Sequence, residues 1–144
     1  MDRAWRDATK RGNLPVVRER LANGIDPDAR DRYGQTGLML AAYGGHSAVI
    51  DALIAAGARL DVTAKYGLTA LMLAILGGHV EIARTLLRAG ADAGIRGMGP
   101  PGFAGKSALD LARERGMRDP VRELEPPVSP TPEPPLPEPP ADSG

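Results

Sequence analysis

The chain contains no cysteine and only two histidines, which restricts the chemistry open to it. Without thiols it can form neither disulfides nor zinc sites with thiolate ligands. The N-terminal segment MDRAWRDATKRG is charged and lacks the apolar core that a signal peptide needs. No hydrophobic run approaches the length of a membrane-spanning helix. We therefore expect a cytoplasmic protein without a membrane or metal partner.

The chain also lacks a net charge, because 18 Lys and Arg residues balance 18 Asp and Glu residues. This balance argues against a nucleic-acid partner, for which a basic surface is typical. All 18 cations but only 14 of the acids lie in residues 1–124, which leaves four acids for residues 125–144. The latter segment also holds nine of the 14 prolines. Since proline fixes φ and removes a backbone donor, we expect a folded domain over 1–124 and a disordered acidic tail over 125–144.

The folded part repeats with a spacing of 33 residues: RYGQTGLMLAAYGGHSAVIDALIAAGARL (32–60) aligns with KYGLTALMLAILGGHVEIARTLLRAGADA (65–93). The same register reaches back to the N-terminus. It also reaches forward to SALDLARERG (107–116), which matches TALMLAILGG (69–78) at a spacing of 38, because five extra residues precede it. A fixed period of this size indicates stacked repeats. We place the units at about 1–30, 31–63, 64–96 and 97–124.

Each unit is expected to form two short helices joined by a turn. Thr36, Thr69 and Ser107 stand where a hydroxyl can accept from the free amides of a first helical turn. Gly57 and Gly90 follow the second helices and are expected to end them with positive φ. Helices this short are marginal in isolation, so neighbouring units must hold them.

The middle units share the pattern D-x-x-G-x-T-x-L-x-x-A-x-x-x-G-H, followed by L-[LI]-x-x-G-A, with Ala64 in place of the first Asp in the third unit. This pattern is similar to the ankyrin repeat. In the second unit it is carried by Asp31, Gly34, Thr36, Leu38, Ala41, Gly45, His46, Leu53, Gly57 and Ala58. In the third unit it is carried by Gly67, Thr69, Leu71, Ala74, Gly78, His79, Leu86, Leu87, Gly90, Ala91 and Asp92.

The resemblance implies an all-α repeat fold, an α-solenoid of four stacked helix-turn-helix units with β-hairpin fingers. It also implies a monomeric, non-catalytic scaffold without a cofactor, which binds another protein on the concave face of fingertips and first helices. The outer units are expected to be caps with a polar outer face. Thr9, for example, stands where the second unit has Ala42, and Trp5 takes the core position of Leu38.

A different interpretation starts from Gly105-Lys106-Ser107, which opens a helix after a glycine-rich run and resembles a phosphate-binding loop. In the loop pattern G-x-x-x-x-G-K-[ST] the first glycine would fall on Pro100, and no buried strand precedes this segment. In the repeat register Ser107 is a helix N-cap and Lys106 a variable position. We prefer the N-cap and keep a nucleotide-binding enzyme as an alternative.

The histidines and the loop aspartates do not indicate a metal site. His46 and His79 occupy the same place in adjacent units. Helices pack about 8–10 Å apart, which is too far for a shared ion. We expect each histidine to stabilise the turn between the helices of its own unit. Asp26, Asp28, Asp31 and Asp61 do not have the spacing of a calcium loop, and we expect solvated turn residues that help to cap strands and helices.

The partner is expected to contact exposed positions of the fingers and first helices. Four of the five aromatic residues fall there, and aromatic and arginine side chains are typical interface anchors. Because the face is basic, we expect an acidic partner. The predicted contact residues are Arg32, Tyr33, Gln35, Tyr43, Lys65, Tyr66, Leu68, Leu76, Phe103 and Lys106. Two alternatives remain open: the tyrosines only stabilise the stack, or the tail is the main binding element and the repeats are a spacer.

Overall fold

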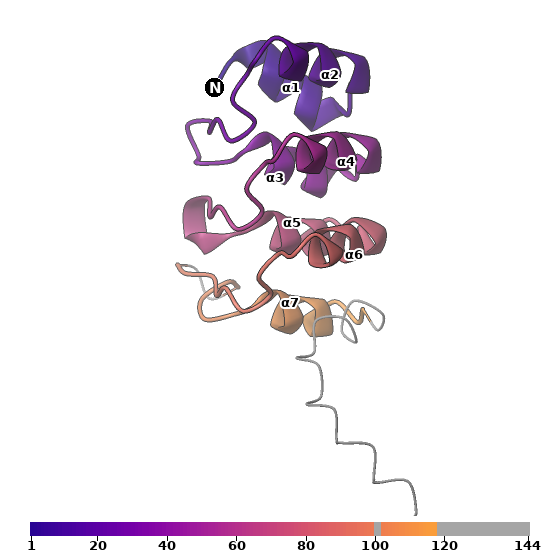
Figure 1. Cartoon of the computed structure of the whole chain (residues 1–144). Helices are drawn as coiled ribbons and strands as arrows, with labels where there is room; N and C mark the ends of the chain where they lie inside the picture. Colours follow the sequence, from indigo (N-terminus) through magenta and orange to yellow (C-terminus); the bar gives the residue numbers. More distant parts are fainter. Residues whose placement is uncertain (100–101, 118–144) are drawn as a thin grey trace, which may run out of the picture.

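The computed structural model describes residues 1–99 and 102–117, and these residues form layers stacked in sequence order (Figure 1). They contain seven α-helices, one 3-10 helix and no β-strand. The helices are α1 (Arg3–Arg11) and α2 (Leu14–Ala22), α3 (Gly37–Gly44) and α4 (Ser47–Ala55), α5 (Ala70–Leu76) and α6 (Val80–Arg88), and α7 (Ala108–Glu114). The second helix expected in the fourth unit and the tail at 125–144 lie outside the described residues.

The predicted helix caps are confirmed. The Thr36 hydroxyl accepts from the Met39 amide at 3.4 Å, and the Thr69 hydroxyl accepts from the Met72 amide at 3.2 Å. Ser107 caps α7 in the same way. Each hydroxyl satisfies an amide that has no partner inside its helix. The short polar residue after each finger therefore fixes where a first helix begins.

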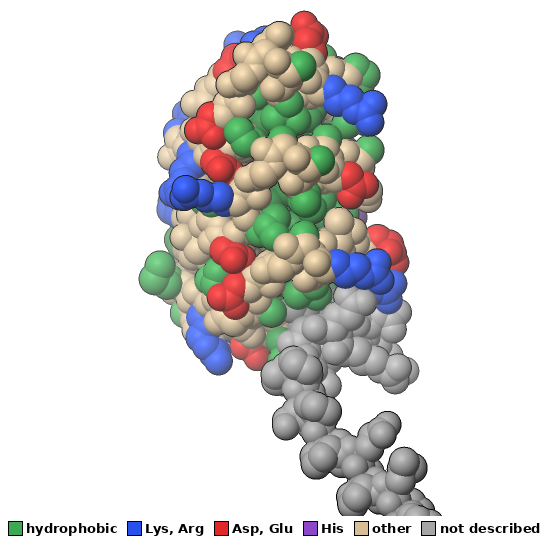
Figure 2. All heavy atoms as spheres, viewed as in Figure 1, with side chains coloured by type: hydrophobic (Ala, Val, Ile, Leu, Met, Phe, Trp, Pro, Cys, Tyr) green, Lys and Arg blue, Asp and Glu red, His purple; other side chains and the backbone are tan. Residues whose placement is uncertain are grey.

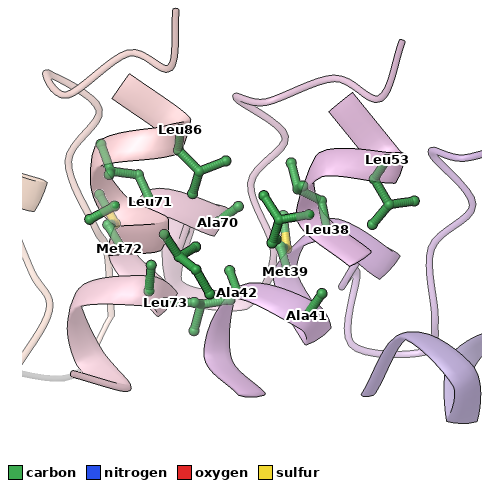
Figure 3. Close-up of a cluster of buried hydrophobic side chains, with 14 of the residues drawn as sticks. Leu38, Met39, Ala41, Ala42, Leu53, Ala70, Leu71, Met72, Leu73 and Leu86 are labelled. Atoms are coloured by element: carbon green, nitrogen blue, oxygen red, sulfur yellow. The ribbon is translucent and has the colours of Figure 1, made fainter. Parts of the chain in front are cut away.

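The core lies between the layers and consists of the apolar sides of the helices. Figure 3 shows side chains of α3 and α5 meeting between the second and third units, with Leu53 of α4 and Leu86 of α6 above them in the view. Trp5 of α1 has an exposed fraction of 0 %, which confirms its predicted core position. Apolar contact between successive layers holds helices that are too short to be stable alone.

Thr9 corrects the expected pattern of the N-terminal cap. It is fully buried rather than placed on a polar outer face. Its hydroxyl donates to the carbonyl oxygen of Trp5 at 3.0 Å, and its methyl group lies where a Cβ at Gly37 would come within 2.9 Å. Because threonine can satisfy its hydroxyl within its own helix, it packs at the junction with the second unit.

The fingers are hydrogen-bonded turns, and the expected β-hairpins are not formed within the described residues. In the first finger a single antiparallel bridge joins Arg30 to Thr36. In the second finger the Ala64 amide donates to the Leu68 carbonyl at 2.8 Å around the 3-10 turn Lys65–Gly67. Each turn is too short to add the further pairs that a ladder needs.

Backbone bonds also join the fingers to one another. The Lys65 amide donates to the Tyr33 carbonyl at 3.2 Å, and the Met98 amide donates to the Tyr66 carbonyl at 2.7 Å. Three successive fingers are therefore held side by side, although no strand connects them.

The two histidines join adjacent units, which corrects their expected role within one turn. Nε2 of His46 donates to the Lys10 carbonyl at 2.9 Å, and Nε2 of His79 donates to the Tyr43 carbonyl at 3.0 Å. A Cβ at Gly45, whose φ is 81°, would lie 2.5 Å from Cε1 of His79. The His79 ring therefore requires glycine at position 45. The Gly-His pairs are thus features of the junctions between units rather than of a single unit.

Two aspartates join successive loops and are therefore more than solvated turn residues. The Asp28 carboxylate accepts from the Arg59 amide at 2.8 Å, and the Asp61 carboxylate accepts from the Asp92 amide at 2.7 Å. The same contact, repeated from one unit to the next, supports the ends of the second helices.

Candidate partner-binding face

An apolar groove crosses the fingertips, with a volume of about 270 Å³. We call it the aromatic groove; it is lined by Tyr33, Gln35, Ala64, Lys65, Tyr66, Leu68, Leu73 and Phe103. Six of these residues belong to the predicted contact set, and they come from three successive fingers. Ala64 and Leu73 did not stand out in the sequence, because they look like ordinary apolar positions of the repeat.

The aromatic rings of the groove are partly exposed. The Tyr66 and Phe103 rings stack with their centroids 6.1 Å apart and 23° between their planes. Tyr33 nevertheless has an exposed fraction of 50 % and Tyr66 one of 37 %. The rings thus do both things weighed from the sequence: they contact neighbouring fingers, and they leave apolar surface open to a ligand.

Tyr66 has a strained backbone. Its φ of 65° and ψ of 17° make it the one non-glycine residue with positive φ in the described part of the chain. A bulky side chain in this region costs about 1–3 kcal/mol and persists only where the surroundings fix it. Here the Met98 amide bonds its carbonyl, and a Cβ at Gly99 would lie 2.5 Å from the ring. The finger is therefore built around this ring, which it holds at the surface.

Cations flank the rings of the groove. The Arg32 guanidinium carbon lies 5.6 Å from the centroid of the Tyr33 ring, and Nζ of Lys65 lies 5.1 Å from the centroid of the Tyr66 ring. Both distances are within the range of cation–π attraction. Figure 2 shows charged side chains of both signs along the finger edge, beside a central column of hydrophobic ones. The groove thus has an apolar floor and basic edges.

A second hollow, of about 780 Å³, adjoins the groove at Tyr33. We call it the arginine cleft; it is lined by Met1, Arg3, Arg6, Asp7, Arg30, Asp31, Arg32 and Tyr33. Arg3, Arg30 and Arg32 are exposed and have no ion-pair partner among residues 1–99 and 102–117. Arg32 was predicted from the sequence as a contact residue, whereas Arg3 and Arg30 were missed. The signal that could have indicated the cleft was the spacing of Arg3 and Arg6 on one helix.

Asp31 fixes the cleft to the finger. One oxygen of its buried carboxylate accepts from the amides of Tyr33 and Gln35 at 2.9 Å each. Its other oxygen accepts from Nε of Arg6 at 3.2 Å. The carboxylate therefore neutralises Arg6 and orients the backbone that carries Tyr33.

A third hollow, of about 290 Å³, lies along the first helices. We call it the helix hollow; it is lined by Arg6, Lys10, Gln35, Met39, Leu40, Tyr43 and Gly44. It shares Gln35 with the aromatic groove and Arg6 with the arginine cleft. Tyr43, with an exposed fraction of 58 %, is thus set apart from the other aromatic residues but belongs to the same continuous face.

Two predicted contact residues, Leu76 and Lys106, line none of the three hollows. Leu76 is half-buried and packs against the core. Lys106 pairs with Glu114 of α7. The amide and hydroxyl of Ser107 donate to the Asp110 carboxylate at 3.0 and 3.2 Å, and the Asp110 amide returns a bond to the hydroxyl. The bond from the Ser107 amide lowers the pKa of Asp110. The groups that would hold a phosphate are therefore engaged within the chain.

Within the described ranges, no three His, Asp or Glu side chains gather as ligands for a metal ion. Among the same residues, no helix combines the length and the apolar character needed to cross a membrane.

Comparison with known proteins identifies the repeats. A family model described as ankyrin repeats (3 copies) matches residues 6–96. The chain is 40 % identical to osteoclast-stimulating factor 1 of Gallus gallus over 53 residues, and this alignment covers 37 % of this chain and 26 % of that protein. The same protein of Sus scrofa is 40 % identical over 53 residues, covering 37 % and 25 %. That of Rattus norvegicus is 38 % identical with the same coverage. The match thus spans about a quarter of the length of these curated relatives.

Proposed function

The chain belongs to the ankyrin-repeat family, whose repeats are general protein–protein interaction modules and generally non-catalytic, and from this premise we propose that it binds a partner protein. The proposed contact surface is the continuous face made of the aromatic groove, the arginine cleft and the helix hollow. The monomeric state, the cytoplasmic location and the absence of a cofactor and of catalytic activity expected from the sequence are part of the proposal.

The observation that carries this proposal is the aromatic groove. Tyr33, Tyr66 and Phe103 come from three successive fingers and line one apolar groove. Aromatic side chains anchor interfaces because they bury much apolar area with few rotatable bonds. The strained backbone of Tyr66 adds support, since strain of this kind concentrates at binding sites.

The charge of the face favours an acidic partner. Arg3, Arg30 and Arg32 surround the arginine cleft, and Lys65 stands at the edge of the groove. Complementary charges accelerate association and exclude partners of the same sign. Because the anchors lie on the repeats, we favour the repeat face over the tail as the main binding element for the partner.

The test is to capture partners from native lysate with the full chain and with the double variant Tyr33→Ala/Tyr66→Ala. Asp51→Ala, on the exposed side of α4, is the control. A captured protein is then titrated against each variant. Loss of interface anchors costs about 2 kcal/mol or more, so we expect about a 30-fold or greater loss of affinity for the double variant and none for Asp51→Ala.

A melting curve of each variant separates binding from stability. If the tyrosine variants bind the partner normally but melt several degrees early, these rings are stacking residues and the proposed face is wrong. The single variant Tyr43→Ala then tests whether the helix hollow takes part in the same interface.

A further inference from the structure

The aromatic groove and the arginine cleft together fit one kind of ligand, a segment that is both rich in proline and acidic. The chain carries such a segment at residues 125–144. We propose that this tail docks along the two hollows of its own repeat domain. The inference deepens the proposed function, because it assigns a ligand class to the same face and makes the tail a competitor of the partner.

The groove supplies what a proline-rich segment needs. Its floor is formed by Tyr33, Tyr66 and Phe103, and partly exposed aromatic rings are the surfaces on which polyproline II ligands pack. The tail has nine prolines in 20 residues, with P-x-x-P spacings such as Pro127 to Pro130 and Pro132 to Pro135. A chain whose φ angles are already fixed loses little conformational entropy on docking.

The cleft supplies what the acids of the tail need. The tail carries Glu125, Glu133, Glu138 and Asp142 and contains no lysine or arginine. The exposed arginines of the cleft have no carboxylate partner among the described residues. Tyr33 lines both hollows, so one continuous segment can place prolines on the rings and carboxylates on the arginines.

The tail is long enough to reach. Twenty residues in the polyproline II conformation span about 60 Å at about 3.1 Å per residue. The groove begins at Phe103 of the fourth unit, and the cleft lies beside α1 of the first. Three layer spacings of about 10 Å each separate these units. A tethered segment of this length acts at an effective concentration on the order of millimolar, so weak contacts suffice.

The composition of the chain provides a direct test. The full chain has one tryptophan and no cysteine. The variant Ser143→Cys therefore accepts a single label that absorbs tryptophan emission. Trp5 lies in α1, between the arginines Arg3 and Arg6 of the cleft, so energy transfer from Trp5 reports whether the end of the tail is near the cleft.

If the tail docks, we expect strong energy transfer that does not change on dilution. Transfer should fall by at least about twofold in Tyr33→Ala/Tyr66→Ala, because the rings supply the apolar contact. It should fall similarly in Glu138→Gln/Asp142→Asn, because charges at the cleft steer and hold the segment. The control is Asp51→Ala, which changes an exposed residue of α4 that lines none of the three hollows, and it should leave transfer unchanged.

Equal transfer in the parent and in both double variants would overturn the proposal. So would loss of transfer on adding excess unlabelled chain, because the tail would then occupy a second copy. The charge variant lies outside the repeat units and keeps the test valid even if the tyrosine variant fails to fold. Partner binding is measured separately: a partner that binds normally to Tyr33→Ala/Tyr66→Ala contradicts the proposed function and leaves the transfer result standing.

Discussion

The junction between the second and third units and the junction between the third and fourth units differ at the position of the histidine. At the first of these, His79 covers Gly45 and donates to the Tyr43 carbonyl. At the second, the repeat register places Met117 where the histidine would be, and a Cβ at Gly78 would meet no described residue within 4 Å. The repeat pattern thus reproduces the layer and the backbone bond between fingers, from the Met98 amide to the Tyr66 carbonyl, but not the histidine bond between layers.

The last junction depends on other contacts. The capping box of Ser107 and Asp110 starts α7, and the Gly105 amide donates to the Gly97 carbonyl at 2.9 Å to close the long finger. Lys106, which precedes α7, pairs with Glu114, the last residue of that helix. These bonds order the fourth unit internally, whereas the histidines tie one unit to the next. A stack can therefore be regular in shape although different contacts hold its successive junctions.

Trp5→Ala should give the largest effect on a junction that has a histidine. Trp5 is fully buried where the first unit meets the second, so its loss should reduce the free energy of unfolding by about 3–5 kcal/mol. Trp5→Phe is the control: the indole N–H has no partner among the described residues, so this change removes volume but no hydrogen bond. Urea unfolding of the full chain measures both. Equal losses for the two variants would show that ring volume does not decide the effect.

His79→Ala should remove the difference between the two junctions. It leaves the Tyr43 carbonyl without its donor and opens the space above Gly45, so we expect a loss of about 1–2 kcal/mol. Met117→Ala is the equivalent change at the last junction and should cost less, because no bond between layers is lost. Thermal unfolding of both variants measures the two losses of stability. A larger loss for Met117→Ala would reverse the comparison.

Ser107→Ala should weaken the last layer from within, by about 1 kcal/mol for a lost N-cap. The pKa of Asp110 is lowered in the folded chain, chiefly by the bond from the Ser107 amide. Its contribution is therefore present above about pH 4 and lost as the pH falls through the folded pKa. The loss of stability on acidification should be smaller in Asp110→Asn than in the parent chain. Because the carboxylate is exposed, the effect is small. If the stability of the parent chain and that of Asp110→Asn depend on pH in the same way, the capping box does not contribute measurably to stability.

Met117→His should make the last junction resemble the others. A ring at this position meets open space above Gly78, and its Nε2 would face the Leu76 carbonyl in the repeat register. One added hydrogen bond stabilises by about 1 kcal/mol at most, so the α7 amides should exchange with solvent about fivefold more slowly. Unchanged exchange would mean that the backbone of the last junction does not match the other two.

Tyr33→Ala should have the smallest effect on stability. Its ring is half exposed, and such substitutions usually change stability by no more than about 0.5 kcal/mol. The melting temperature of the full chain measures this directly. A loss as large as that of His79→Ala would show that the fingertip ring belongs to the cohesion of the stack rather than to its binding face.

The sequence predicted what repeats locally. The caps at Thr36, Thr69 and Ser107 and the buried place of Trp5 follow from a pattern of apolar and turn residues within one unit. Tyr33 and Tyr66 occupy equivalent positions 33 residues apart, and Phe103 lies one residue before the next equivalent position, so the stacking of the units brings the three rings together.

The hydrogen bonds that join one unit to the next could not be inferred in the same way. The partner of His79 is a backbone carbonyl 36 residues earlier, and that of Asp28 is an amide 31 residues later. Any residue can supply such a group, so no sequence pattern marks it. The arginine cleft was missed for a related reason: α1 and the first finger are separate segments, and only stacking brings Arg3 beside Arg30.

The open space above Gly78 has a consequence for linkage between binding and folding. In a linear array each boundary contributes its own free energy, so opening starts at the weakest boundary. The boundary that lacks the histidine bond separates Tyr33 and Tyr66 from Phe103. A ligand that contacts all three rings binds only while the fourth unit is closed on the third, and it stabilises that closed state in proportion to the logarithm of its concentration. A ligand bound in the groove thereby holds the fourth unit closed on the third, which is the role that a histidine has at the other two junctions.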